Sequence, residues 1–270
     1  MIGFRERGAI MEKAVLVSNR GNGIVLITLN RPEAANSLSI KMLEQLRDAA
    51  AACKLDRTVR CIVITGTGEK AFCAGADLKE RTGMDMNQVR RTVSFIRETI
   101  NDVEALPQPV IAAMNGAAVG GGMEVALACD IRIASTTATF ALAETSLGII
   151  PGAGGTQRLP RLIGKGRAKE LIFTARKIDA EEARNIGLVE AVSPPEFLLD
   201  KALEMAGRIV RNAPIAVTQA KFAIDKGMEV ELNTGLAIEQ HAYEATIPTK
   251  DRLEGLQAFK EKRPPIFKGE

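Results

Sequence analysis

The sequence predicts an α/β fold that is followed by an all-helical C-terminal region. Strand-like and helix-like segments alternate through the first two thirds of the chain, which is typical of parallel sheets joined by crossover helices. After about Pro194 only helical patterns follow. The 270 residues suffice for one α/β unit with an appendage. We therefore expect a core over residues 1–195 and a helical region over 196–270.

The first elements follow from local patterns. β-Branched runs at 14–18 and 23–30 flank the turn signal "NRGNG" and predict a hairpin. Apolar residues with helical spacing over 37–56 predict a helix, with Ser37 or Ser39 as its N-cap. The uninterrupted apolar run 61–66 predicts a strand that is buried on both faces.

The middle of the chain continues the alternation. A polar stretch at 77–87 predicts a loop, and a helix is expected near 88–105, where "LPQPV" ends it. A strand over 110–116 leads into a short helix within "NGAAVGGGMEVALACD". Two further strands are expected at 131–135 and 138–142.

The C-terminal part contains four helical segments with no strand between them. Pro214 suits the first turn of one of these helices. The segments are residues 195–213, 214–227, 231–247 and 249–263. At the other end, residues 1–10 are expected to be a loose extension, and Met11 is an alternative to Met1 as the start.

Composition excludes several classes of protein. The net charge is +3, aromatic residues make up 4% and Tyr243 is the single tyrosine, which argues against a nucleic-acid partner. The four cysteines have no C-x-x-C spacing, so reduced thiols in a cytoplasmic protein are expected. The longest apolar tract, Val110 to Cys129, is interrupted by Asn115, by glycines and by Glu124, which argues against a membrane span.

Three consecutive glycines precede a carboxylate in "AVGGGMEVAL". Glycine lets a ligand approach the backbone closely, and the first amides of a helix have no intrahelical partner. Gly120, Gly121, Gly122 and Glu124 are therefore candidates for a site that binds negative charge, or for an oxyanion hole when that charge exists only in a transition state. A tight turn with close helix packing explains the glycines equally well.

A second glycine-containing turn, "AGAD" at 74–77, can supply another backbone donor. An ordinary loop with Asp77 as N-cap is the simpler interpretation of this segment alone. The spacing Gly66-x-Gly68-x-x-Ala71 matches a dinucleotide fingerprint only partly, and no amphipathic helix follows it. We therefore do not expect dinucleotide binding.

Glu144 is the second carboxylate near a glycine-rich turn, since "PGAGGTQR" follows it. Two carboxylates in a dry pocket can act as base and acid, because burial raises their pKa values towards neutrality. An exposed position near a helix start is the alternative for Glu144.

His241 is the only histidine, which excludes a serine–histidine triad or a histidine metal cluster in the usual form. Lys260 and Lys262 of the basic C-terminal segment can meet solvent or a phosphate.

Together, five segments resemble the enoyl-CoA hydratase/isomerase (crotonase) family, over nearly the whole chain from about residue 14. The chain looks most similar to the methylglutaconyl-CoA hydratase branch, whose vertebrate member is also described as an AU-rich RNA binder. The first helix here lacks the lysine density associated with that RNA binding. The segments are "NRPEAANSLS", "AFCAGADLKE", "PVIAAMNGAAVGGGMEVALACDIRIA", "FALAETSLGIIPGAGGTQRLPRLIG" and "A-x-x-x-GLV".

The resemblance implies a spiral of β-β-α units, a C-terminal helical region for trimerisation and a homohexamer of two trimers. It also implies hydration of an enoyl-CoA in fatty acid β-oxidation or, as alternatives, methylglutaconyl-CoA hydration or double-bond isomerisation. No metal or redox cofactor is expected, since coenzyme A is part of the substrate. The acyl-pocket walls are expected from residues near 81–95 and from the C-terminal helices.

The resemblance also assigns roles to residues. The oxyanion hole would use the amides of Ala76 and Gly121, with Glu124 as base and Glu144 as acid. Lys79 and Lys262, the latter from a neighbouring subunit, would meet the coenzyme phosphates. The full set of expected substrate contacts is Ala74, Gly75, Asp77, Leu78, Lys79, Gly120, Gly122, Pro151, Gly152, Phe259 and Lys262.

Overall fold

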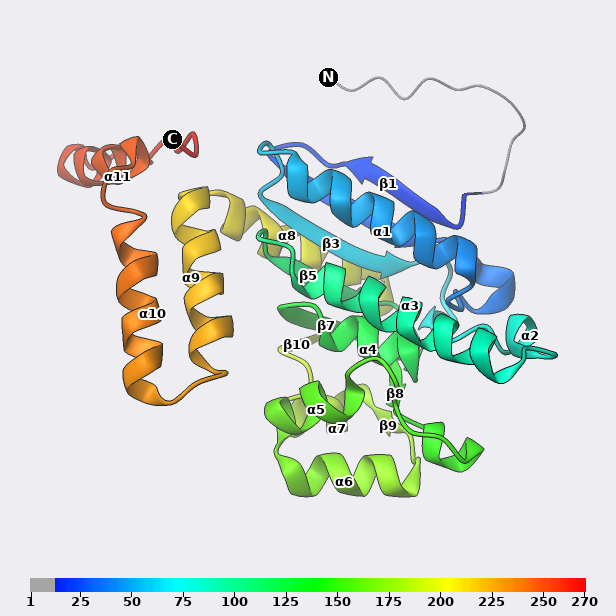
Figure 1. Cartoon of the computed structure of the whole chain (residues 1–270). Coiled ribbons are helices and arrows are strands. Elements are labelled where there is room, and N and C mark those ends of the chain that lie inside the picture. The colour runs from blue at the N-terminus through cyan, green and yellow to red at the C-terminus, as the bar shows by residue number, and fades with distance from the viewer. Residues whose placement is uncertain (1–12) are drawn as a thin grey trace.

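Two β-sheets form the centre of the computed structural model, which describes residues 13–270. The expected loose extension at 1–10 and both possible start residues lie outside the described part of the chain. Figure 1 shows helices packed around the sheets and a group of C-terminal helices that projects from them. The predicted α/β fold with C-terminal helices is confirmed.

The larger sheet has six strands in the order β1-β2-β3-β5-β7-β10. β1 and β2 form the predicted antiparallel hairpin, and all other neighbours in this sheet are parallel. Every residue of β3 is buried, as its apolar run predicts. The strands are β1 (Val15–Asn19), β2 (Ile24–Leu29), β3 (Cys61–Gly66), β5 (Val110–Met114), β7 (Ile131–Ser135) and β10 (Ala191–Ser193).

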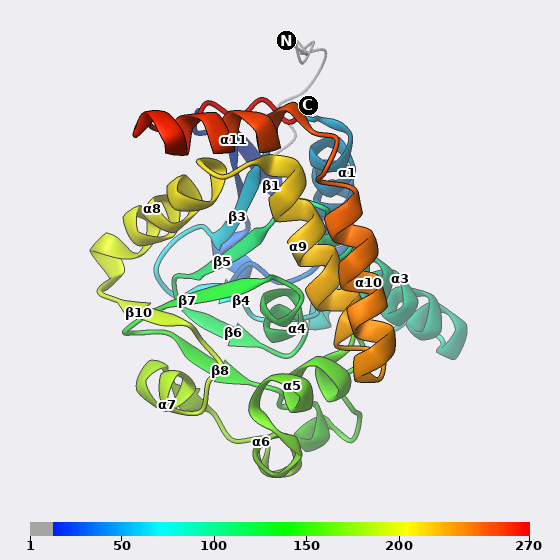
Figure 2. The same cartoon turned by 90° about the vertical axis from the view of Figure 1, so that its left-hand side faces the viewer.

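The smaller sheet has the order β4-β6-β8-β9, with only the β8–β9 pair antiparallel. β3, β5 and β7 each lead into a strand of the smaller sheet before a helix returns the chain, which gives the expected spiral of β-β-α units. Figure 2 shows the two sets of strands next to each other. The strands are β4 (Ala71–Cys73), β6 (Ala117–Val119), β8 (Thr139–Ala141) and β9 (Ile178–Asp179).

The strand expected over 110–116 ends at Met114 as β5, and a short strand that the sequence did not predict, β6, follows after a break at Asn115 and Gly116. At the break, the Asn115 side chain accepts a hydrogen bond from the Gly66 amide at 2.9 Å. A Cβ atom on Gly116 would lie 2.6 Å from the Lys70 backbone, so only glycine fits beside that turn. This close approach moves the chain from one sheet to the other, which a pattern of apolar residues does not reveal.

Capping residues set the starts of the long helices. Ser39, one of the two expected N-caps, accepts the Met42 amide at the start of α1. The helix expected near 88–105 begins two residues earlier because Asp85 and Gln88 form a capping box. The helices are α1 (Ile40–Leu55), α2 (Leu78–Arg81), α3 (Met86–Glu104), α4 (Gly121–Leu127), α5 (Gly155–Ile163), α6 (Lys165–Thr174), α7 (Ala180–Asn185), α8 (Leu198–Val210), α9 (Pro214–Gly227), α10 (Leu232–Glu244) and α11 (Lys250–Glu261). Three 3₁₀ turns are η1 (Pro32–Ala34), η2 (Glu144–Leu147) and η3 (Pro195–Phe197).

The larger sheet buries both of its faces, as alternate side chains of β3 show. Ile62 and Ile64 belong to the cluster that includes side chains of α1, α3 and α4. Cys61 and Val63 belong to the opposite cluster, which α8 covers with small and apolar residues such as Ala202. α8 therefore packs on the core, although it belongs to the region after residue 195. The division of the chain into a core over 1–195 and a helical region over 196–270 stays a prediction.

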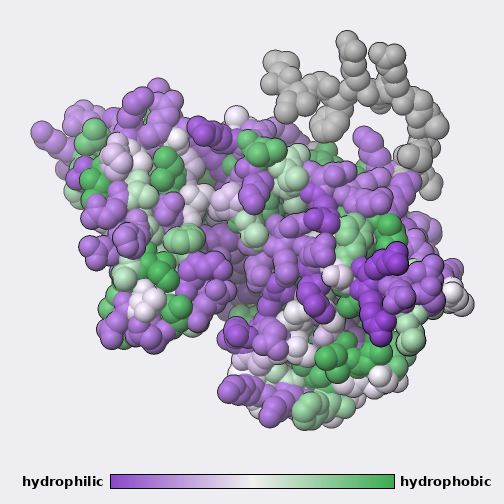
Figure 3. Space-filling model, viewed as in Figure 1, coloured by the Kyte–Doolittle hydropathy of each residue, from purple (hydrophilic) through white to green (hydrophobic). Residues whose placement is uncertain are grey.

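α9 and α10 pack against each other, and α11 follows them at the end of the chain (Figure 1). Gly227 and Gly235 face each other where the two helices approach. Several large apolar side chains of α9 and α10 expose about half of their surface or more. Figure 3 shows the corresponding hydrophobic areas among hydrophilic ones on these helices, at the left of the view. These side chains include Phe222, Ile224, Leu232, Leu236 and Tyr243.

The four cysteines, Cys53, Cys61, Cys73 and Cys129, are buried and unpaired, in agreement with the expected reduced thiols. Across residues 13–270, no helix has both the length and the apolar character that crossing a bilayer requires.

Candidate active site

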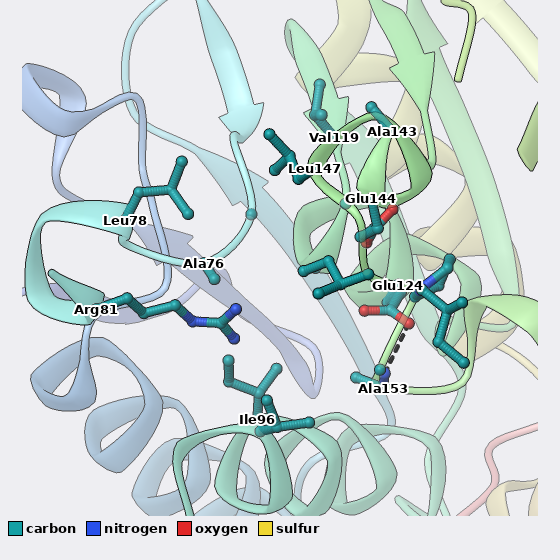
Figure 4. Close-up of a pocket in the computed structure, with 18 of the residues that line it drawn as sticks. Ala76, Leu78, Arg81, Ile96, Val119, Glu124, Ala143, Glu144, Leu147 and Ala153 are labelled. Atoms are coloured by element: carbon teal, nitrogen blue, oxygen red, sulfur yellow. Dashed lines mark hydrogen bonds between the residues drawn. The ribbon is translucent and has the colours of Figure 1, made fainter. Parts of the chain in front are cut away.

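A pocket of about 680 Å³ lies between α2 and α3 on one side and β6, α4 and η2 on the other. Its wall is mainly apolar, and four charged side chains reach it: Arg81, Arg97, Glu124 and Glu144. Figure 4 shows Glu124 and Glu144 on one side of this pocket, with Ala76 and Arg81 on the other. The sequence motifs around the two glycine-rich turns thus meet in one cavity.

The "AGAD" turn presents a free backbone amide to the pocket. The Leu38 amide donates to the Gly75 carbonyl at 2.8 Å, and the Asp77 amide donates to the Leu38 carbonyl at 3.3 Å. Because neighbouring residues of an extended segment point their polar groups in opposite directions, the amide of Ala76 faces away from this bridge. Among the described residues it meets no acceptor.

The second free amide belongs to Gly121, the first residue of α4. Gly120 has φ +53° and ψ −123°, which only glycine adopts readily, and this turn starts the helix. The Gly121 amide has no acceptor in residues 13–270, as expected for the first turn of a helix. A Cβ atom on Gly121 would lie 3.6 Å from the Ala76 nitrogen, so the two free amides are neighbours.

Glu124 lies one turn into α4 and is almost fully buried, with 3% of its surface exposed. Its Oε1 accepts hydrogen bonds from the amides of Ala153 at 2.7 Å and Gly155 at 2.8 Å. Burial raises the pKa of Glu124, while these two amides and the charge of Arg158 oppose the increase. Its Oε2 makes no hydrogen bond within the described residues, so this oxygen is available to a ligand.

Glu144 begins η2 and lies beside the glycine turn, since a Cβ atom on Gly120 would be 3.1 Å from its Oε1. Its Oε2 is buried and has no hydrogen-bond partner among residues 13–270. Burial raises the pKa of Glu144 to about 7, and the nearby charge of Glu124 adds to the increase. The alternative of an exposed Glu144 is therefore wrong.

Arginine side chains hold the segment that binds Glu124. Arg158 donates to the Ala153 carbonyl at 2.8 Å and forms an ion pair with Glu104 at 2.6 Å. Arg97 donates to the Gly152 carbonyl at 2.9 Å. The carbonyl of Ala153 and its amide thus have separate partners, which fixes the position of the amide relative to Glu124.

The other expected contact residues divide into two groups. Ala74, Gly75, Leu78, Gly120, Pro151 and Gly152 line the pocket. Five others do not line it in the single chain: Asp77, Lys79, Gly122, Phe259 and Lys262.

Local contacts explain why most of this second group lies elsewhere. Asp77 caps α2 and pairs with Arg31 at 2.9 Å. Gly122 packs on β4, where a Cβ atom would lie 2.0 Å from the Cys73 carbonyl oxygen. Phe259 belongs to α11 and is 86% exposed, and Lys262 caps the same helix. Contacts of these residues with a coenzyme stay predictions.

Much of the apolar wall comes from residues that no sequence motif singles out. Val89, Val93 and Ile96 recur at helical spacing on one face of α3, a signal that the pattern of 88–105 contained. The expectation of a wall near 81–95 agrees with them, whereas the described C-terminal helices contribute nothing to this wall. Leu147, Ile149 and Ile150 complete it from η2 and the loop after it.

Comparisons with known proteins agree with this geometry. Residues 19–270 match the family model described as enoyl-CoA hydratase/isomerase. A Bacillus subtilis protein with the provisional name enoyl-CoA hydratase/isomerase YngF is 59% identical, over 96% of this chain and 100% of its own length. The human mitochondrial methylglutaconyl-CoA hydratase is 52% identical over 94% of this chain and 76% of its own. The crystal structure of an enoyl-CoA hydratase from Bacillus anthracis has a TM-score of 0.94 and 58% identity, and covers 95% of this chain and 100% of that one.

Proposed function

Because the chain belongs to the enoyl-CoA hydratase/isomerase family, we propose that it hydrates a trans-2-enoyl-CoA to the 3-hydroxyacyl-CoA. The observation that carries the proposal is the meeting of two buried carboxyl groups and two free amides in one pocket. An isomerase moves a double bond and needs no water, whereas a hydratase needs groups that bind water and exchange protons with it.

In the proposed reaction, the thioester oxygen accepts hydrogen bonds from the amides of Ala76 and Gly121. Water adds through its oxygen to C3, and negative charge moves to the thioester oxygen as an enolate. Donors aimed at such a developing charge are each worth about 3 kcal/mol in comparable sites. A side chain on Gly121 would crowd these donors, which supports the glycine as a functional requirement.

Glu124 and Glu144 then divide the proton transfers. Glu124, held by two amides, takes the proton of the attacking water, and Glu144 gives a proton to C2 of the enolate. A pKa of about 7 supports Glu144 as the acid, because a large fraction of it is protonated near neutral pH. Transfer of the proton from Glu124 to Glu144 restores the starting state. No metal or redox cofactor takes part in this proposal.

The remaining contacts of the coenzyme and the assembly belong to the same proposal. We assign Lys79 and, from a neighbouring subunit, Lys262 and Phe259 to the coenzyme. Assembly into trimers and a hexamer is supported by the exposed apolar side chains of α9 and α10, such as Phe222 and Leu236. Light scattering on the purified protein measures the assembly.

The proposal is tested with crotonyl-CoA, whose conjugated enoyl absorbance disappears on hydration. Glu124→Gln and Glu144→Gln are each expected to lower kcat by orders of magnitude, with 3-hydroxybutyryl-CoA as the product of the unchanged protein. A shifted double bond in the product would instead identify an isomerase. Hydration that survives both substitutions unchanged would refute the proposed roles.

A second candidate substrate is methylglutaconyl-CoA, because the human relative at 52% identity carries that name. Its hydration uses the same two carboxyl groups and the same amides, so it differs from the first candidate only in the acyl group. A comparison of kcat/KM for crotonyl-CoA, medium-chain and long-chain enoyl-CoA and methylglutaconyl-CoA separates the two candidates.

A further inference from the structure

Arg31 lies behind the pocket wall and does not line the pocket that the described chain forms. Its side chain is half-buried, and its Nη1 donates to the Ser37 carbonyl at 3.0 Å and to Oδ2 of Asp77 at 2.9 Å. Nη1 carries two hydrogens, and these two acceptors use both of them. A charged side chain in a polar segment is usually solvated, whereas this one binds buried groups next to the "AGAD" turn.

A left-handed turn brings Arg31 and Ser37 together. Ala35 and Asn36 have φ of 50° and 55°, a conformation that is unfavourable for alanine. The buried side chain of Asn36 holds the turn, because it accepts from the Arg31 amide at 2.9 Å and donates to the Ala71 carbonyl at 2.8 Å. The turn is therefore attached to β4, the strand that leads to the oxyanion hole.

Two peptide groups connect Arg31 to the proposed oxyanion hole. The carbonyl and the amide of one planar trans peptide group point in opposite directions. The Ser37 carbonyl accepts from Arg31, and the other end of the same peptide group, the Leu38 amide, donates to the Gly75 carbonyl at 2.8 Å. The Gly75 carbonyl in turn shares its peptide group with the Ala76 amide, which meets no acceptor among residues 13–270. The hydrogen bonds thus form a chain from the guanidinium to the proposed position of the thioester oxygen.

A positive charge at the start of such a chain makes each later amide a stronger donor. Hydrogen bonds in series polarise one another by about 10–30% per bond, and the effect is larger where water is excluded. Ser37 and Leu38, which carry the chain, are both buried. An enolate oxygen accepts hydrogen bonds more strongly than a thioester carbonyl does, so a stronger donor would favour the transition state over the bound substrate.

Asp77 holds the guanidinium in this position. Its Oδ2 accepts from Arg31 and from the Ser37 hydroxyl at 3.3 Å, while its Oδ1 accepts from the Lys79 amide at 3.1 Å. The Asp77 amide also donates to the Leu38 carbonyl at 3.3 Å. The ion pair therefore joins the two segments that flank the Ala76 amide.

We infer that Arg31 is a positioning residue of the oxyanion hole, which acts through the Ser37–Leu38 and Gly75–Ala76 peptide groups to aim the Ala76 amide and to strengthen it as a donor. This inference rests on the proposed function, because that function places the thioester oxygen at Ala76. Since Arg31 does not reach the pocket, its effect is on the transition state and belongs to kcat, not to KM.

Kinetics of an uncharged variant test the inference. Arg31→Met removes the charge and the donors and keeps an unbranched side chain. Its kcat for crotonyl-CoA should fall by about 10-fold, less than the roughly 100-fold that loss of a whole oxyanion donor costs, with a nearly unchanged KM. Arg31→Lys should recover part of the rate, because it keeps a charged donor. An unchanged kcat in Arg31→Met would overturn the inference.

Vibrational spectroscopy measures the donor strength directly. Butyryl-CoA is saturated and cannot be hydrated, and a ¹³C label at its thioester carbonyl isolates the C=O stretching band in infrared difference spectra. Stronger hydrogen bonds to the oxygen lower the frequency of this band. The band should therefore lie at lower frequency in the unchanged protein than in Arg31→Met. A fall in kcat with an unmoved band would overturn the inference, since it would show that Arg31 only supports the fold.

A double variant separates the missing chain of hydrogen bonds from a stranded charge. Arg31→Met leaves the carboxylate of Asp77 buried without its partner, which by itself destabilises a protein. Arg31→Met combined with Asp77→Asn removes that charge and keeps a side-chain oxygen to cap α2. The loss of kcat and the band shift should persist in the double variant. A return of both to the values of the unchanged protein would refute the role of Arg31.

Arg176→Met provides the matched control. Arg176 is also a partly exposed, ion-paired arginine, which contacts Glu170 and Glu182, and it does not line the active-site pocket. Its replacement should change neither kcat nor the carbonyl band. An equal change in Arg176→Met would overturn the inference, because any lost arginine ion pair would then have the same effect.

The two readouts also separate this inference from the proposed function. An Arg31-dependent carbonyl band in a protein that does not hydrate crotonyl-CoA would refute the hydratase activity and keep the role of Arg31. Hydration with a band that is the same with and without Arg31 would do the reverse.

Discussion

The Ala153 amide donates to Oε1 of Glu124 at 2.7 Å, which joins the loop before α5 to the first turn of α4. On the opposite side of the same peptide segment, the Ala153 carbonyl accepts from Arg158 at 2.8 Å. Gly154 makes this possible, because a Cβ atom there would lie 2.0 Å from Arg158 Nη1. The position of Glu124 thus depends on a residue that does not line the pocket.

Arg158 is therefore expected to act as a positioning residue for Glu124. Arg158→Leu should lower kcat by about 10-fold, because the amide that holds the carboxylate loses its anchor. Loss of the nearby positive charge should also raise the pKa of Glu124 further, since Arg158 opposes the effect of burial. The base must be ionised, so the acid limb of the kcat/KM profile should move to higher pH.

Arg161→Leu provides the matched control on the same helix, because Arg161 is exposed and, within residues 13–270, its side chain bonds only to Gln157. Arg158→Lys should recover part of the rate, since it keeps a charge without the planar fork. A drop in rate with an unmoved acid limb would show that Arg158 stabilises the fold and does not tune Glu124.

The pH dependence of kcat/KM in the protein without substitutions tests whether Glu144 acts as the acid. Burial gives Glu144 a pKa of about 7, so the protonated form required for proton donation is lost as the pH rises through that value. We expect kcat/KM for crotonyl-CoA to fall above about pH 7 and to fall again at low pH, where Glu124 becomes protonated. Initial rates between pH 5 and 9 measure both limbs. A rate that only rises through pH 7 would contradict the assigned roles.

Much of the fold and part of the site were predictable from the sequence, for identifiable reasons. The apolar runs of β2, β3 and β5 are short and rich in β-branched residues, which favours strands, and nearly all of their residues are buried. β4 and β6 were not predicted, because strands of three residues leave almost no pattern in a sequence. The break before β6 was not predictable either, because it depends on the close approach of Gly116 to the Lys70 backbone, which lies far away in the chain.

Some residues of the site can be identified from a local motif, whereas others become part of the site only through packing between segments far apart in the chain. Glycines and carboxylates at Gly121, Glu124 and Glu144 carry a local chemical signature. Arg81 carries none, because a charged residue in a polar segment is usually solvated. Its buried Nε depends on how α2 packs against the pocket, and that packing joins segments far apart in the chain.

Substitution of two neighbouring glycines of α4 should have different effects: one should lower activity and the other should lower stability. In Gly121→Ala the new methyl group would lie 3.1 Å from the flexible tip of Leu38 and 3.6 Å from the Ala76 nitrogen. The fold can accommodate it, but the methyl group crowds the two free amides. We expect kcat to fall by about 100-fold, as in sites that lose one oxyanion donor, with a nearly unchanged melting temperature.

Gly122→Ala places its methyl group 2.0 Å from the Cys73 carbonyl oxygen, which is backbone and cannot move aside. This variant should be strongly destabilised or insoluble, whatever its catalytic potential. Thermal melting and crotonyl-CoA kinetics distinguish the two effects. A folded, fully active Gly121→Ala protein would remove Gly121 from the proposed oxyanion hole.

The raised pKa of Glu144 also predicts that this carboxyl group lowers stability at high pH. Its pKa is about 7 in the folded chain against an ordinary value of 4.5, so the unfolded chain loses this proton at lower pH than the folded chain does. The penalty is absent below about pH 4.5, grows between the two values and is complete above about pH 7. Because Glu144 is only partly shielded from water, we expect Glu144→Gln to increase the free energy of unfolding by about 1–2 kcal/mol at pH 8 and by much less at pH 5. Urea unfolding at both pH values measures the difference, with Glu69→Gln as the control at an exposed site. An equal gain at both pH values would show that burial of the charged carboxylate is not the cause.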